Sequence, residues 1–79
     1  MDERQIIGHI HALVDEERGI EGTDLGGRGH DAQRRLREIE VALDQCWDLL
    51  RQRRARRLAG QEPDDAIVRP PIVVETYDQ

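Results

Sequence analysis

Apolar residues in this chain recur at helical spacing in two segments of unequal length. The first segment carries one amphipathic stripe, formed by Ile6, Ile7, Ile10, Leu13 and Val14. The second alternates steps of three and four residues, the a/d spacing of a packed helix seam, at Leu36, Ile39, Leu43, Cys46 and Leu50. These patterns predict one helix over residues 2–18 and a second helix over residues 31–58.

Residues at the ends of the two stripes predict where the helices begin and end. Asp2 and Asp31 carry carboxylates that can accept hydrogen bonds from the free N–H groups of a first helical turn. Gly19 and Gly60 can adopt the left-handed conformation that often ends a helix. The segment between the helices, residues 19–30, holds five of the seven glycines, so we expect a flexible connection and an antiparallel hairpin.

The remainder of the chain, residues 59–79, is predicted to be a turn followed by an extended arm. β-branched residues surround a proline pair, and the apolar positions of the arm are Ile67, Val68, Ile72, Val73, Val74 and Tyr77. Because this run is too apolar for a solvated tail, we expect the arm to lie against the helices. The predicted fold class is all-α, a single domain over residues 1–79 made of a two-helix antiparallel hairpin with an extended C-terminal arm.

The two predicted helices differ in length, at roughly 25 Å and roughly 40 Å. An antiparallel hairpin then places Glu3 near Cys46. The residues beyond that point, among them Trp47, Leu49 and Leu50, project past the first helix. This surface has to be covered by the chain's own arm, by a second copy or by another protein. For so small a chain we expect two copies to associate through their second helices into a four-helix bundle.

One tract of the second helix combines the apolar seam with tryptophan and arginine, the residue types that anchor protein interfaces. The predicted interface residues are Leu43, Cys46, Trp47, Leu49, Leu50, Arg53 and Arg54. The arm could cover the same surface within one chain, and the sequence leaves these two arrangements open.

Charge alternates in sign along the chain. Seven acids and two arginines lie in residues 1–27, five acids and nine arginines in residues 28–57, and five acids and one arginine in residues 58–79. A hairpin therefore lays an acidic helix along a basic one and brings the acidic arm near the basic end of the second helix. On the seam of the first helix we expect Glu17 to pair with Arg34, Arg35 or Arg37.

A cluster of arginines near the end of the second helix is the strongest charge feature, at Arg51, Arg53, Arg54, Arg56 and Arg57. Such a cluster can bind the phosphates of nucleic acid. The net charge of −5 and the presence of one Trp, one Tyr and no Phe count against that partner. Arginines in a last helical turn also complement the helix dipole. The sequence favours this structural role and keeps nucleic-acid binding as the alternative function.

Residues suited to catalysis or metal binding are few. His9 and His11 stand two residues apart on a helix and point in different directions, so they cannot hold one ion together. Cys46 falls on the seam, where a thiol behaves as a small apolar group. The chain has no serine, no HExxH, no CxxC and no phosphate-binding loop. We therefore predict no catalytic residues, no metal site within one chain, no cofactor and no enzymatic activity.

The remaining composition bears on where the protein resides. A single cysteine suits a reducing compartment, and the sequence shows neither a signal-like N-terminus nor an apolar run of membrane length. We expect a cytoplasmic protein with no membrane partner. All twelve cations are arginine, which is typical of a GC-rich genome.

Three segments of the chain are distinctive: residues 10–17 (IHALVDEE), residues 43–54 (LDQCWDLLRQRR), and residues 60–64 (GQEPD) followed by Val68-Arg69-Pro70. They resemble an actinobacterial family of short proteins catalogued as domain of unknown function 2630, over nearly the whole chain. The resemblance implies an actinobacterial cytoplasmic source and carries no activity or site residues. The function predicted from the residues is a small non-enzymatic interaction module, a homodimeric adaptor or regulator that binds itself or another cytoplasmic protein.

Overall fold

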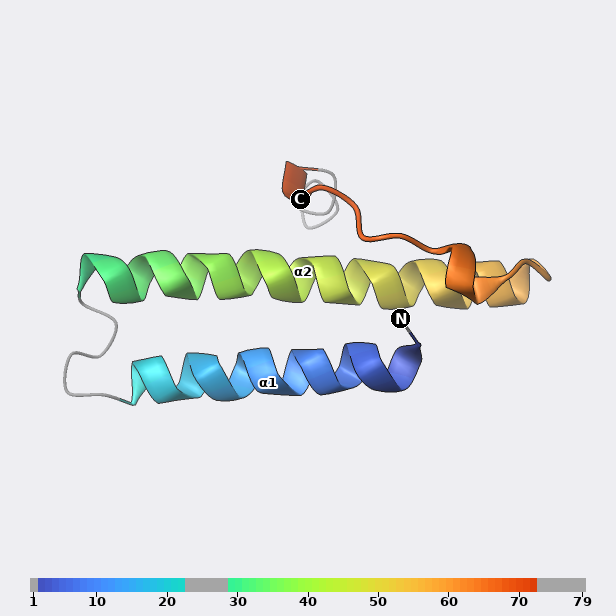
Figure 1. Ribbon diagram of the computed structural model, residues 1–79. Coiled ribbons are helices and arrows are strands. Elements are labelled where there is room, and N and C mark those ends of the chain that lie inside the picture. Colours follow the sequence, from blue (N-terminus) through green and yellow to red (C-terminus); the bar gives the residue numbers. More distant parts are fainter. Residues whose placement is uncertain (1, 23–28, 73–79) are drawn as a thin grey trace.

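The computed structural model describes residues 2–22 and 29–72 (Figure 1). Helix α1 spans Glu3–Glu21, helix α2 spans His30–Leu58, and a 3₁₀ turn, η1, spans Pro63–Asp65. The two helices lie side by side and antiparallel, and the segment after η1 returns along α2 (Figure 1). No strand occurs in the described ranges. The all-α hairpin is thus confirmed, while Val73, Val74 and Tyr77 lie outside the described residues.

Helix α1 begins where the sequence predicted and ends later. The Asp2 carboxylate accepts a hydrogen bond from the Gln5 backbone N–H at 2.8 Å, and the Gln5 side chain accepts one from the Asp2 N–H at 2.9 Å. The predicted end at Gly19 is wrong, because the helix continues to Glu21. Ile20 packs against the core, and that burial outweighs the cost of about 1 kcal/mol for a helical glycine.

Helix α2 begins without a side-chain cap. Its N-cap is Gly29, so the prediction of Asp31 as the cap is wrong. Asp31 lies inside the first turn, where its negative charge still suits the helix dipole, and it pairs with Arg34 at 2.9 Å. At the other end Gly60 has φ of +73° directly after the helix, which confirms it as the stop signal.

The core is a narrow strip between the two helices. Its buried members are Ile6, Ile10, Leu13, Ile39, Cys46 and Leu49. Leu43 and Leu50, which share the predicted seam, are only half-buried, and Ile7 is 43% exposed. The molecule measures 49 × 25 × 15 Å. Because its smallest dimension is little more than one helix with its side chains, the helices form a single layer with two open flanks.

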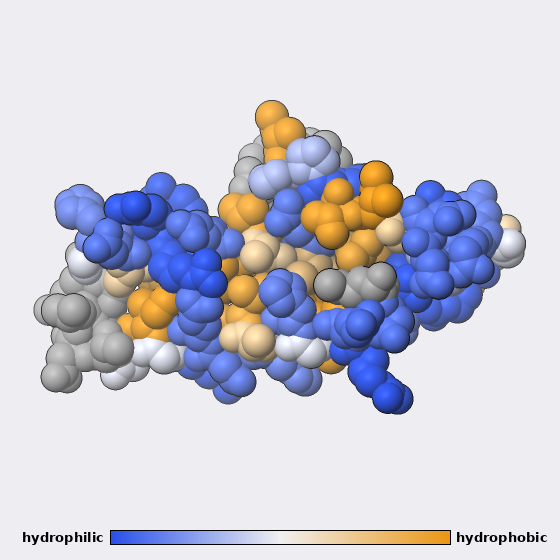
Figure 2. All heavy atoms as spheres, viewed as in Figure 1, coloured by the Kyte–Doolittle hydropathy of each residue, from blue (hydrophilic) through white to orange (hydrophobic). Residues whose placement is uncertain are grey.

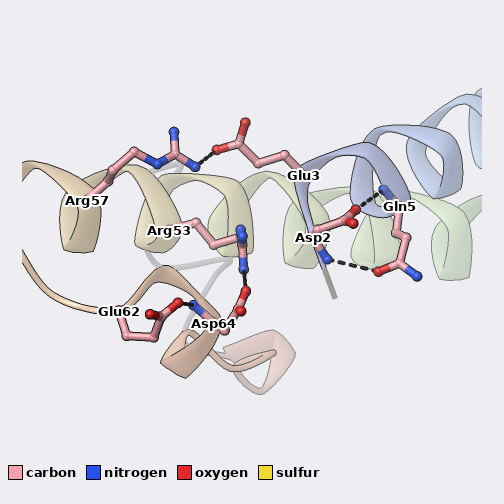
Figure 3. A network of polar contacts seen from close by, with 7 residues as sticks. All are labelled: Asp2, Glu3, Gln5, Arg53, Arg57, Glu62 and Asp64. Atoms are coloured by element: carbon pink, nitrogen blue, oxygen red, sulfur yellow. Dashed lines mark hydrogen bonds and ion pairs between the residues drawn. The ribbon is translucent and has the colours of Figure 1, made fainter.

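Two ion pairs join the helices. Arg35 donates through Nε and Nη2 to the Glu16 carboxylate at 2.5 and 2.8 Å. Near the other end, Arg57 of α2 pairs with Glu3 of α1. Glu3, which was predicted to lie near Cys46, instead pairs with a residue eleven positions further along α2, and its long side chain and that of Arg57 span part of this distance (Figure 3).

The contacts between the helices change two further predictions. The acid that pairs with Arg35 is Glu16, while Glu17 sits half-buried one position further round the helix. Leu49 is 5% exposed and belongs to the same core as the residues of α1, so it does not project past that helix. The overhang is shorter and consists of the last turns of α2, which η1 packs against (Figure 1). Neither helix is apolar over a long enough stretch to cross a bilayer, as far as the described residues go.

Candidate functional site

The C-terminal arm docks on a polar face of α2. Gln45, Asp48 and Gln52 share this face because they recur at steps of three and four residues. The side-chain amide of Gln52 donates to the carbonyl of Ile67 at 2.7 Å, and that of Gln45 donates to the carbonyl of Arg69 at 3.1 Å. Carbonyls two residues apart in an extended segment point the same way, so one helix face can hold both. We call these three residues the arm-docking face.

Asp48 is the centre of this face. Its side chain is only 3% exposed and accepts hydrogen bonds from Arg69 Nε at 2.8 Å, from a second Arg69 nitrogen and from Gln52 at 2.9 Å. Hydrogen bonds from Arg69 are the main reason why the pKa of Asp48 lies below its ordinary value, against the opposing effect of burial. A buried carboxylate with a two-pronged arginine partner is a strong and directional contact.

A second contact holds η1 at the end of the hairpin. Arg53 is 7% exposed and donates to the Asp64 carboxylate at 2.8 Å, as Figure 3 shows. Glu62 caps the same turn by accepting from the Asp64 backbone N–H at 3.2 Å. The hydrogen bond from Arg53 lowers the pKa of Asp64. The expected approach of the acidic arm to the basic end of α2 is confirmed by this pair.

The described apolar side chains of the arm are mostly exposed. The expectation that the arm lies against the helices is confirmed for its described residues, although Ile67, Val68 and Ile72 are 68%, 58% and 76% exposed. Polar contacts position its backbone, and among the described arm residues Ala66 packs against the core while Val68 lines one cavity. Figure 2 shows hydrophobic surface on the arm above α2, with hydrophilic surface at the right end of the molecule.

That cavity has a volume of about 140 Å³ and lies between α1, α2 and the arm. Its lining residues are His9, Ala42, Gln45, Cys46, Leu49 and Val68. Burial raises the pKa of the Cys46 thiol, which keeps it protonated and weakly nucleophilic. Within the described residues no group of three or more His, Cys, Asp and Glu side chains is placed to hold a metal ion.

The predicted interface residues separate into two groups in the fold. Cys46, Leu49 and Arg53 are buried inside the chain. The other four form a surface: Leu43 and Leu50 are half-buried, and Trp47 and Arg54 are exposed, Trp47 by 52%. At about 100° per residue, this surface lies roughly 150° around α2 from the arm-docking face. We call it the arm-free face.

The predicted arginine cluster does not present one surface. Arg53 and Arg57 pair with Asp64 and Glu3, from η1 and α1 respectively (Figure 3). Arg56 contacts the Gln61 side chain at 3.4 Å, and Arg54 is exposed on another side of the helix. The guanidinium groups therefore point in several directions, and two of them are already neutralised.

Sequence reasoning missed the residues that hold the arm. Gln45, Asp48 and Gln52 were part of a distinctive tract, but no role was predicted for them. Two signals could have indicated that these residues bind the arm. One is their spacing of three and four residues, and the other is Arg69 as the single cation of an acidic tail. A single arginine in a segment that turns back along a polar helix face is a candidate partner for an acid on that face.

Comparison with known proteins supports the resemblance seen in the sequence. A family model described as "Protein of unknown function (DUF2630)" matches residues 2–79, and the chain belongs to this family. An uncharacterized protein of Mycobacterium bovis is 47% identical over 75 residues, covering 92% of this chain and 86% of the relative. Uncharacterized proteins of two Mycobacterium tuberculosis strains match with the same identity and coverage. No solved structure gives a significant match.

Proposed function

We propose that this member of the DUF2630 family is a small non-enzymatic interaction module that forms a homodimer and acts as an adaptor or regulator in the cytoplasm. The observation that carries the proposal is the position of Trp47. Its side chain is 52% exposed at the middle of a helix whose other sides are covered by α1 and by the arm. A large aromatic side chain presented in this way is the residue type that most often anchors a protein interface.

The surroundings of Trp47 support this proposal. Leu43 and Leu50 lie one turn away on each side and keep part of their apolar surface in solvent. Ile7 of α1 is 43% exposed, and its helical position places it on the same flank of the layer. Grouped apolar residues on a small monomer are typical of a surface that binds another protein. Stacking two single-layer hairpins on this flank would give the four-helix bundle expected from the sequence.

The non-enzymatic part of the proposal draws on the state of the one cysteine. Cys46 is the sole thiol of the chain, and its burial keeps it in the unreactive protonated form. The phosphate-binding alternative has less support, because Arg53 and Arg57 already pair with carboxylates. Titration of a DNA duplex at low salt tests that alternative, and tight binding that weakens steeply with salt would favour it over the interaction module.

The test of the proposal is the mass in solution by light scattering after size exclusion, over a wide range of protein concentration. We expect the mass of two chains at high concentration. We also expect the emission of Trp47, the single tryptophan, to shift to shorter wavelength as the dimer forms. Trp47→Ala should weaken the dimer at least about tenfold.

Ile67→Ala is the matched control, because Ile67 is similarly exposed but lies on the arm. It should leave the dimerisation constant unchanged. A wild-type protein that keeps the mass of one chain at every concentration would contradict the homodimer.

A further inference from the structure

A stripe of seven residues runs along the arm-free face of α2, and its order is nearly symmetric about Trp47. The stripe advances by three or four residues and consists of Leu36, Glu40, Leu43, Trp47, Leu50, Arg54 and Leu58. Leucines stand next to the tryptophan on both sides and again at both ends. Between them, Glu40 stands seven residues before Trp47 and Arg54 seven residues after it.

We infer that two copies of the chain pair through this stripe, with their α2 helices antiparallel and the two-fold axis at Trp47. The inference rests on the proposed function, because it takes a second copy as the partner. A two-fold axis sets each residue opposite the one equally far on the other side of the axis. Glu40 of one copy therefore faces Arg54 of the other, and each such contact occurs twice.

The charges on the stripe favour this orientation over the parallel one. Glu40 and Arg54 are exposed, and within the described part of the chain neither of them takes part in an ion pair, whereas Arg53 and Arg57 both do. The antiparallel arrangement pairs the two charges across the interface. A parallel arrangement in the same register would set Glu40 against Glu40 and Arg54 against Arg54, and like charges facing each other oppose association.

The leucines at the ends of the stripe agree with the same axis. Leu58 is 86% exposed on the last turn of α2, which projects beyond α1 (Figure 1). Leu36, half-buried near the other end, stands as far from Trp47 as Leu58 does, at eleven residues. The antiparallel pair brings these two leucines together. The shared length, residues 36–58, is about 33 Å, long enough for the second copy to cover the projecting end of α2.

The arm leaves this pairing unobstructed. Its contacts on α2, at Gln45, Asp48 and Gln52, lie on a face roughly 150° away from the stripe. Both arms therefore stay docked on the outside of the dimer. Ile7, exposed on the same flank as the stripe, adds apolar area from α1 of each copy.

Charge reversal tests the orientation with residues that are exposed and outside the core. Glu40→Arg and Arg54→Glu each create two repulsive contacts in the antiparallel dimer, so each variant alone should dimerise roughly tenfold or more weakly than wild type. An equimolar mixture of the two variants should recover the wild-type constant, because every charge then meets its opposite. Sedimentation equilibrium measures all three constants, and Asp31→Arg, at an exposed acid outside the stripe, is the matched control.

Single reversals that leave the dimerisation constant unchanged would overturn the antiparallel pairing, because parallel helices set like charges together before and after the change. The homodimer of the proposed function would survive that result. A wild-type protein that stays monomeric would instead end both proposals, so the two failures are distinguishable.

Cross-linking checks the register independently. Leu36→Cys and Leu58→Cys should form a disulfide-linked dimer when mixed and oxidised, in higher yield than either variant alone. The native Cys46 is buried and does not compete. Efficient cross-linking of the Leu58→Cys variant with itself would place like ends together and overturn the two-fold axis at Trp47.

Discussion

The two long faces of α2 that α1 leaves uncovered differ in chemistry. The arm-docking face carries Gln45, Asp48 and Gln52, and it binds the backbone and one arginine of the same chain. The arm-free face carries Leu43 and Leu50, which pack partly against the core, around Trp47, which is 52% exposed. Directional polar groups suit a single tethered partner, whereas an apolar stripe gains by burial against any complementary surface. The arm-docking face thus serves internal structure, and the proposed function uses the arm-free face for association.

The largest effect should come from breaking the arm-docking face at its centre. Arg69→Ala leaves the Asp48 carboxylate buried at 3% exposure without its main partner. We expect a loss of about 2–3 kcal/mol in the free energy of unfolding, measured by urea denaturation. Hydrogen exchange should also show that the arm has lost protection.

Arg34→Ala is the matched control for that experiment. Its ion pair with Asp31 is 69% and 97% exposed, so its removal should cost no more than about 0.5 kcal/mol. Equal effects of the two substitutions would contradict the central role of the Asp48–Arg69 pair.

A smaller effect on stability should appear when the pH is lowered, through the Asp48–Arg69 pair of the arm-docking face. The pKa of Asp48 is lowered in the fold from an ordinary value of 3.8, mainly by Arg69. A lowered pKa contributes stability above the unfolded value, and the contribution is lost as the pH falls through the folded value. The difference in urea stability between wild type and Arg69→Ala should therefore be constant above about pH 5 and shrink below pH 3.8. A difference that grows on acidification would contradict the ion pair.

The smallest expected effect is the coupling between the two faces. Arg69→Ala and Trp47→Ala act on opposite sides of α2 and share no contact, so their effects should add to within about 0.5 kcal/mol. We expect the double variant to show the hydrogen exchange of the arm seen in Arg69→Ala and the dimerisation constant of Trp47→Ala. Coupling clearly above that value would mean that the arm also takes part in the dimer.

Sequence patterns predicted the elements well and their contacts poorly. The capping box at Asp2 and the left-handed Gly60 are local features, and both appear where the pattern placed them. Gly19 was wrongly predicted to end α1, because Ile20 packs against the core and the helix continues. Asp31 was wrongly predicted to cap α2, because the N-cap is Gly29, which has no capping side chain. A local preference of about 1 kcal/mol yields to the burial of one isoleucine.

The candidate site shows the same division. The composition around Trp47 indicated an interface tract, and the fold leaves four of its residues on one exposed or half-exposed surface. The burial of Arg53 against Asp64, and the docking of Arg69 on Asp48, depend on contacts eleven and twenty-one residues apart. Helical periodicity assigns a residue to a face, but it does not say which distant segment will cover that face.

The sequence by itself therefore determined two amphipathic helices, their antiparallel pairing, a charged and partly apolar arm, and membership of the family. The structural properties follow from hydrophobic period, glycine placement and charge sign, and family membership follows from the three distinctive segments. Only the tertiary structure decided the helix register, the docking of the arm by its backbone, and the exposure of Trp47. Those outcomes depend on which of several competing surfaces matches in shape and hydrogen bonding, and that competition is resolved only when the whole chain packs.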